Sequence, residues 1–205
     1  MLGEARQQQI VLASASPRRH QILDLAGIPH YVLPSQVDEH IAPRDSVTAY
    51  IEDLALLKAR SVFGRTSADP QLSGRTVLAA DTIVVLDGRM LGKPADARHA
   101  ARMLRALSGR THQVITGVAL ISNAGAHTFS EVTDVTFDQL TETDIEDYIS
   151  SGEPFDKAGA YGIQGRGGAF VTAIRGDYYN VVGLPLNRVL HELAALNADG
   201  GFDEH

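Results

Sequence analysis

The chain has 205 residues, of which 44% are apolar and 21% charged, a balance typical of a globular domain with a sizeable core. Its formal net charge of -7 argues against sequence-independent nucleic-acid binding but leaves room for a local basic pocket that binds an anionic small molecule. It has no cysteine and no apolar run of about 18 residues, which excludes disulfides, thiol chemistry and a transmembrane helix. The start, MLGEARQQQ, lacks the apolar run of a signal peptide, so we expect a cytoplasmic protein.

The apolar pattern predicts alternating strands and helices in the first half of the chain. Residues 10–13 indicate a buried strand, and the next helix is expected to have Ser16 as its cap, Pro17 at its first position and Gly27 at its end. The segments that follow are, in chain order, a helix over 46–63, a loop over 64–75, a strand over 76–86, a hairpin turn at 87–88 leading to 90–91, a helix over 96–107, and strands over 113–121 and about 128–140.

The last third of the chain departs from this alternation. A helix is predicted over 143–150, with Thr143 and Glu146 at capping-box spacing, then a glycine-rich stretch, one or two strands around 170–182 and a helix from Pro185 to about residue 196. Alternation followed by an antiparallel region favours a mixed α/β sheet flanked by helices over a regular doubly wound sheet. Neither a P-loop nor a dinucleotide-binding glycine motif follows a strand.

Two adjacent arginines, Arg18 and Arg19, stand at the start of the first helix. A helix N-terminus already carries partial positive charge, so cations there need an anion to offset them. The apolar residues Ile22, Leu23, Leu25 and Ala26 are expected to form the buried stripe of this helix. Helical spacing puts Arg19 along that stripe, and the hydroxyl of Ser14 lies just upstream. These residues fit a phosphate site. The alternative is a solvated first turn whose arginines reach outward.

Two further charges interrupt apolar patterns. Lys58 falls four residues from both Leu54 and Val62, inside the stripe of the second helix, where an ammonium needs a partner or a ligand unless its end reaches water. Asp81 is the only polar member of one face of the strand VLAADTIVVL. A carboxylate there pairs with a cation, binds a metal or serves as a base; a structural Asp held by backbone donors at a bulge is the alternative.

Other candidates are weaker when taken alone. The glycine-rich stretch that contains Gln164 allows close backbone approach to a ligand, or simply tight turns, and Gln164 can read a base edge. The eight histidines show no HExxH or other metal spacing, so any metal is expected to be held by oxygen atoms and to be Mg²⁺ or Mn²⁺. Cations for phosphates, a carboxylate and a polar pocket together indicate phosphoryl chemistry on a nucleotide.

Six blocks occur in collinear order: LASASPRR, the VDE of residues 37–39, LLKAR, AADTIVVLDGRMLGKP, LSGRTHQVITGVAL, and DKAGAYGIQGRGGAFV with GDYYNVVGLPL. Together they resemble the Maf family of nucleoside triphosphate pyrophosphatases over nearly the whole chain. The resemblance implies one domain over residues 1–205, with a core of about 10–196, tails of 1–9 and 197–205, and an elongated α/β fold similar to that of the inosine triphosphate pyrophosphatases. It also implies hydrolysis of a nucleoside triphosphate to the monophosphate and pyrophosphate with a divalent cation.

The resemblance also implies roles for individual residues. It makes Asp81 the general base and, with Glu39, a metal ligand. The family's phosphate-side positions fall on Ser14, Arg19, Glu39, Lys58 and Lys93. The positions that separate the substrate subgroups fall on Arg18, Thr82 and Gln164, and here they look like the dTTP/UTP subgroup.

The resulting hypothesis is a pyrimidine-triphosphate pyrophosphatase, with modified pyrimidine triphosphates as further candidate substrates. A regulator of septum formation that binds nucleotide without hydrolysing it is the rival from another class. An α/β domain whose charges are merely on the surface is the third reading, and it predicts no thermal shift with any triphosphate. A homodimer is compatible with all three readings, and the sequence does not decide the oligomeric state.

Overall fold

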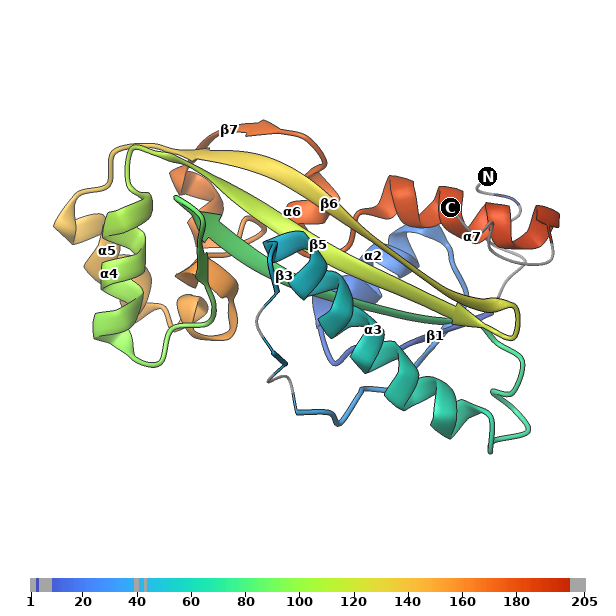
Figure 1. Cartoon of the computed structure of the whole chain (residues 1–205). Coiled ribbons are helices and arrows are strands. Elements are labelled where there is room, and N and C mark those ends of the chain that lie inside the picture. Colours follow the sequence, from blue (N-terminus) through green and yellow to red (C-terminus); the bar gives the residue numbers. More distant parts are fainter. Residues whose placement is uncertain (1–2, 4–8, 39–40, 43, 200–205) are drawn as a thin grey trace. The chain divides into compact units, whose positions relative to one another are not determined.

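The computed structural model describes residues 3, 9–38, 41–42 and 44–199. In chain order its helices and strands are β1 Ile10–Leu12, α2 Pro17–Ala26, β2 His30–Val32, α3 Val47–Thr66, β3 Val77–Leu86, β4 Arg89–Leu91, α4 Ala97–Leu107, β5 Thr111–Ser122, β6 Gly125–Phe137, α5 Glu142–Ser150, β7 Val171–Arg175, α6 Tyr178–Val182 and α7 Leu186–Asp199 (Figure 1). Short 3-10 helices cover Glu153–Asp156, Ala158–Ala160 and Arg166–Phe170.

Among these residues the strands pair in the order β2-β1-β3-β5-β6-β7, and β4 pairs with β3. Parallel and antiparallel pairs occur in the same sheet, so the predicted mixed α/β sheet is confirmed. The chain divides into two compact units. The first comprises Met1–Asp81, Thr116–Ser130 and Gly183–His205, and the second comprises Thr82–Ile115 and Glu131–Val182.

In the first unit, β1 lies between two parallel neighbours. Its Val11 is opposite Val77 of β3 and Tyr31 of β2. Parallel strands need a crossover connection, and α2 and α3 provide the two crossovers here. The sequence pattern did not predict β2, because it is only three residues long and its second and third residues are exposed.

Helix α2 begins at Pro17 and ends at Gly27, as predicted. Its Ser16 has the extended backbone of an N-cap, but the hydroxyl makes no capping hydrogen bond. Instead the Ser16 N–H donates to Oγ of Ser14 (3.2 Å). The expected burial of Leu25 is wrong, because 67% of this residue is exposed. Leu25 lies roughly 110° around the helix from the centre of the buried side, which is formed by Arg19, Ile22, Leu23 and Ala26.

Helix α3 is capped by Ser46, whose hydroxyl accepts from the Ala49 N–H (3.1 Å). It extends to Thr66, three residues beyond the predicted end, into the expected loop. Its buried side packs against the first-unit parts of β1, β3 and β5. This core contains Val11, Ala13, Ala55, Ala59, Val62, Val77, Ala79, Ala119 and Ile121.

In the second unit, α4 and α5 lie side by side (Figure 1). The predicted capping box of α5 is wrong by two residues. Thr141 and Asp144 form the box, since the Asp144 N–H donates to Oγ1 of Thr141 (3.1 Å) and the Thr141 N–H donates to Oδ2 of Asp144 (2.8 Å). The core of this unit includes Val84, Met103, Leu104, Leu107, Val114, Val135, Phe137, Ile145, Tyr148 and Tyr161.

Two local features complete this unit. Asp87 and Gly88 both have positive φ (51° and 75°), which is typical of a two-residue hairpin turn, and the turn joins β3 to β4 as predicted. The stretch predicted as one or two strands over 170–182 is a strand only in β7, and its second part is the short helix α6. The Asp177 carboxylate accepts the N–H groups of Tyr179 and Asn180 there, which favours a helix start over a strand.

Candidate active site

The candidate site begins where β1 ends and α2 starts. Arg19 is buried, with 9% of the residue exposed. Its Nε donates to the carbonyl oxygen of Gly183 (2.8 Å), and its Nη1 donates to Oγ of Ser14 (3.0 Å). The predicted inward orientation of Arg19 is therefore confirmed. A carbonyl oxygen and a hydroxyl oxygen hold its guanidinium in place.

The register of β1 and β3 places the end of β1 beside the first half of β3. Leu12 is opposite Leu78, and the Ala13 N–H donates to the Leu78 carbonyl oxygen (2.8 Å). Continuing this register by two residues puts Ser14 level with Ala80, one residue before Asp81. The carboxyl end of a parallel strand is a common place for a ligand site in an α/β sheet, because the N-terminus of the following helix, here α2, faces that edge.

Lys58 and Asp81 form an ion pair within the first unit. Lys58 comes from the buried side of α3 and is 6% exposed, and its Nζ donates to Oδ1 of Asp81 (3.0 Å). The side chain of Asp81 is 22% exposed, so water reaches this carboxylate. Among the described residues, the other carboxylate oxygen, Oδ2, accepts no hydrogen bond. The arrangement holds a carboxylate in place with one oxygen open to a water or a cation.

Arg18 is half-buried at the second position of α2, beside Arg19. Glu39, the second predicted metal ligand, lies outside the described residues. Thr82, Lys93 and Gln164 belong to the second unit. Thr82 is half-buried next to Asp81 in β3, and the other two are exposed in connecting segments.

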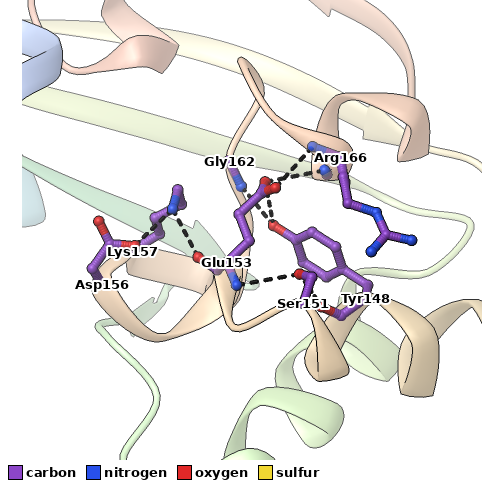
Figure 2. A network of polar contacts seen from close by, with 8 residues as sticks. Tyr148, Ser151, Glu153, Asp156, Lys157, Gly162 and Arg166 are labelled. Carbon is purple, nitrogen blue, oxygen red and sulfur yellow. Dashed lines mark hydrogen bonds and ion pairs between the residues drawn. The ribbon is translucent and has the colours of Figure 1, made fainter.

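Gln164 is carried by a glycine-rich loop, Gly162–Gly168, that surrounds a carboxylate (Figure 2). Oε2 of Glu153 accepts the Arg166 N–H (2.9 Å), and Oε1 accepts the Gly167 N–H (3.2 Å) and the hydroxyl of Tyr148 (2.9 Å). The Tyr148 hydroxyl in turn accepts the Gly162 N–H (3.1 Å). The Glu153 carboxylate thus binds the loop directly at Arg166 and Gly167, and it binds Gly162 through the hydroxyl of Tyr148.

This arrangement has electrostatic and steric consequences. Burial acts to raise the pKa of Glu153, but the donors from Arg166, Tyr148 and Gly167 outweigh it, so the pKa is lowered and the carboxylate stays charged. Burial, together with the bond to Glu153, raises the pKa of the Tyr148 hydroxyl. A Cβ at Gly165 would overlap the carboxylate, which explains why the loop has glycine there.

The family model described as "Maf-like protein" matches residues 9–196. The chain belongs to the Maf-like protein family.

Among the relatives of this Maf-like protein are three described as "dTTP/UTP pyrophosphatase". The Bacillus cereus and Bacillus mycoides proteins are each 49% identical to it over 192 residues. The Bacillus anthracis protein is 48% identical over the same length. Each alignment covers 94% of this chain and 97% of the relative. Among solved structures, the Staphylococcus aureus Ham1 protein is similar with a TM-score of 0.41 and 18% identity, over 63% of this chain and 72% of that one.

Two partners in the Maf-like chain were not predicted from its sequence. The Gly183 carbonyl that holds Arg19 is a backbone atom 164 residues away, and no side-chain pattern signals it. Glu153 has a weak signal, since an acidic residue precedes a run of glycines whose N–H groups are free to converge on it.

Within the described part of the chain, no helix is long and apolar enough to cross a membrane.

Proposed function

We propose that this chain is a nucleoside triphosphate pyrophosphatase that hydrolyses dTTP and UTP to the monophosphate and pyrophosphate. The observation that carries the proposal is the near-complete alignment, at 48–49% identity, with relatives that bear this activity in their names. The Lys58–Asp81 pair and the buried Arg19 supply groups that this chemistry needs.

Asp81 is the general base in this proposal. A proton of the attacking water passes to the Asp81 carboxylate while the water oxygen bonds to the α-phosphorus. The bond between that phosphorus and the oxygen bridging to the β-phosphorus breaks, and pyrophosphate leaves with the electron pair. Support comes from the partial exposure of Asp81 and from Lys58, which orients the carboxylate through Oδ1.

The cations hold the triphosphate in this scheme. Arg19 is fixed by Ser14 and Gly183 before substrate arrives, so little side-chain entropy is lost on binding. Lys58 offers a further positive charge beside the base. Lys93 is assigned to the phosphates, and Arg18, Thr82 and Gln164 to base selection, on the family resemblance alone.

A divalent cation is part of the proposal, and the donor set fits one in part. Asp81 contributes a carboxylate with an open oxygen, and Glu39 would contribute the second carboxylate. Mg²⁺ and Mn²⁺ prefer such oxygen ligands and are commonly held by one or two carboxylates together with substrate phosphates. When bound, the cation would neutralise charge that develops on the phosphates. The cytoplasmic location and a homodimeric assembly stay predictions.

The test is the Asp81→Asn substitution, which keeps the size of the side chain and removes its basicity. We expect pyrophosphate release from dTTP to fall by about 100-fold or more, while dTTP still raises the Tm. Asp87→Asn is the matched control, because Asp87 is exposed in the β3–β4 turn and Asn tolerates its positive φ. Activity of Asp81→Asn equal to that of the unaltered chain would rule Asp81 out as the base.

A panel of canonical and methylated triphosphates, assayed with Mg²⁺, Mn²⁺ and Co²⁺, tests the substrate class. We expect the highest kcat/KM with dTTP, UTP or a modified pyrimidine triphosphate. Thermal stabilisation by dTTP without any release of pyrophosphate would instead favour the nucleotide-binding regulator. No thermal shift with any triphosphate would exclude both readings.

A further inference from the structure

Three metal-binding side chains meet on the first unit, apart from the residues assigned to the reaction. His20 and Asp24 lie one turn apart on the exposed side of α2, and His30 is the first residue of β2. One ligand atom from each lies within 4.8 Å of the others. The connection from α2 to β2 is only three residues long, so the start of the strand returns beside the last turns of the helix.

Polar contacts link the three side chains in one row, with His20 in the middle. His20 Nε2 is 3.3 Å from Oδ2 of Asp24, and His20 Nδ1 is 2.5 Å from Nε2 of His30. His30 Nδ1 is 2.8 Å from the carbonyl oxygen of Ile28. A carbonyl only accepts, so His30 Nδ1 carries the hydrogen, and the lone pair of a neutral His30 is on Nε2, facing His20.

His30 is arranged like a histidine of a transition-metal site, whereas Asp24 must move from the Nε2 side of His20 to the Nδ1 side before all three residues can contact one ion. A backbone carbonyl that accepts from the outer nitrogen of a histidine fixes the tautomer and the ring orientation, which is what ligating histidines require. Ile28 is 2% exposed, so its carbonyl is well anchored. The proton that bridges the two imidazoles is the group that a cation would replace.

We propose that His20, Asp24 and His30 bind a divalent transition-metal ion of the zinc class. Two imidazole nitrogens and one carboxylate suit Zn²⁺, Co²⁺ or Ni²⁺ and not Mg²⁺, which takes oxygen ligands. With metal–ligand bonds of about 2.0–2.1 Å the ligand atoms lie ~3.3 Å apart. The widest spacing in the cluster must therefore close by about 1.5 Å, and the two facing imidazole nitrogens must move apart by about 0.8 Å. The side chains of His20 and Asp24 are 48% and 57% exposed and are able to rotate that far.

The ion would tie α2 to β2, and water would complete its coordination. Because β2 pairs with β1, whose end carries Ser14, the cross-link acts on the segment on which the proposed phosphate site is built. The ligands differ in kind from Asp81 and Glu39. The proposal therefore does not depend on the pyrophosphatase activity.

The experiment measures Zn²⁺ binding to the whole chain by equilibrium dialysis, together with the Tm and the visible spectrum with Co²⁺. We expect one Zn²⁺ per chain that is lost, or bound at least about tenfold more weakly, in His20→Ala and in Asp24→Asn. Zn²⁺ should raise the Tm of the unaltered chain and not of these variants. A Co²⁺ spectrum typical of tetrahedral coordination should disappear in the same variants.

His191→Ala is the matched control, since His191 is an exposed histidine of α7 outside this cluster, and it should bind Zn²⁺ as the unaltered chain does. All substituted positions are on the surface, and far-UV circular dichroism checks that each variant is folded. The proposal is overturned if the unaltered chain binds no Zn²⁺, or if His20→Ala and Asp24→Asn bind it with unchanged affinity. The latter result would assign the ion to other ligands.

Discussion

Arg19 makes two hydrogen bonds from two separate nitrogens, and a lysine has only one side-chain nitrogen to replace them. Its Nε and Nη1 reach Gly183 and Ser14 in the fixed fork of a guanidinium, whereas an ammonium is a point charge on a flexible stem. We expect Arg19→Lys to keep the charge but to lower kcat/KM for dTTP by about tenfold, the effect of one lost hydrogen bond. Steady-state kinetics checks this.

The control for Arg19 is Arg60→Lys, an exposed position on α3 whose substitution should leave kcat/KM unchanged. If Arg19→Lys and Arg60→Lys behave alike, the fork of Arg19 has no part in substrate binding.

His112 is a buried histidine whose neutral form the fold requires. It is 2% exposed, its Nε2 is 2.8 Å from the hydroxyl of Tyr161, and its ring packs edge-on against Phe137. Burial lowers the pKa of His112 to about 4 from 6.5. Between pH 6.5 and 4, His112 is therefore protonated in the unfolded chain and neutral in the folded chain. The contribution of His112 to the free energy of unfolding has its full value above pH 6.5 and declines as the pH falls toward 4.

The predicted loss from His112 is about 3 kcal/mol between pH 6.5 and 4. We expect His112→Gln to be less stable than the unaltered chain at pH 7.5, because the packing against Phe137 changes. Its further loss on acidification should be smaller by about that amount. Urea unfolding of both chains at several pH values measures the difference, and parallel pH profiles would show that His112 is protonated in the folded chain.

At the same scale, sequence patterns predict the direction in which a side chain points better than they predict its partner. Helical spacing correctly predicted that Lys58 and Arg19 point inward. Strand alternation correctly predicted that Asp81 is a polar residue on an apolar face. Periodicity says which side of an element a residue occupies and nothing about which residue meets it. The pairing of Lys58 with Asp81 depends on how α3 packs on β3, and that of Arg19 with Gly183 depends on where the chain returns 164 residues later, so neither was predictable.

At the scale of elements, the glycine-rich loop depends on one carboxylate. Glu153→Gln replaces two acceptor oxygens by one oxygen and one NH₂ group, so the N–H groups of Arg166 and Gly167 can no longer both be satisfied. We expect a loss of about 1–3 kcal/mol in unfolding free energy and faster amide exchange at these two residues. Hydrogen exchange followed by mass spectrometry measures the second effect.

Glu142→Gln is the matched control for the loop. Glu142 is an exposed residue of α5 that pairs with Arg105, and surface ion pairs contribute little to stability. Exchange rates in the loop should be the same as in the unaltered chain. Unchanged rates in Glu153→Gln as well would mean that the loop is held by other contacts.

Most elements followed from local signals, and the exceptions have physical reasons. Gly27 and the Asp87-Gly88 turn marked boundaries correctly, and the helix predicted from residue 46 begins one residue later, after its cap at Ser46. At α5 two threonines each have an acid three residues later, and it is Thr141 that forms the capping box, with Asp144. Strand β2 is stabilised by its pairing with β1 and not by a pattern of its own, so only the tertiary structure reveals it.

At the scale of the whole molecule, the chain passes between the two units four times, after residues 81, 115, 130 and 182. Strands β3, β5 and β6 each contribute residues to both units. Unfolding one unit would therefore free strands that the other unit needs. We expect one calorimetric transition whose enthalpy equals the van't Hoff enthalpy. Two separate transitions in a calorimetric scan would show that the units unfold independently.

The carboxylate inside the glycine-rich loop has an evolutionary consequence. A side chain at the position of Gly165 would force the Glu153 carboxylate to move, because the new Cβ would occupy its space, and the move would disturb the hydrogen bonds that the carboxylate accepts from Arg166 and Gly167. The two positions should therefore change together in descendants of this sequence, the acid being lost before or with the glycine. Substitutions at Glu153 and Gly165 are therefore expected to be coupled, although neither residue is a proposed catalytic group.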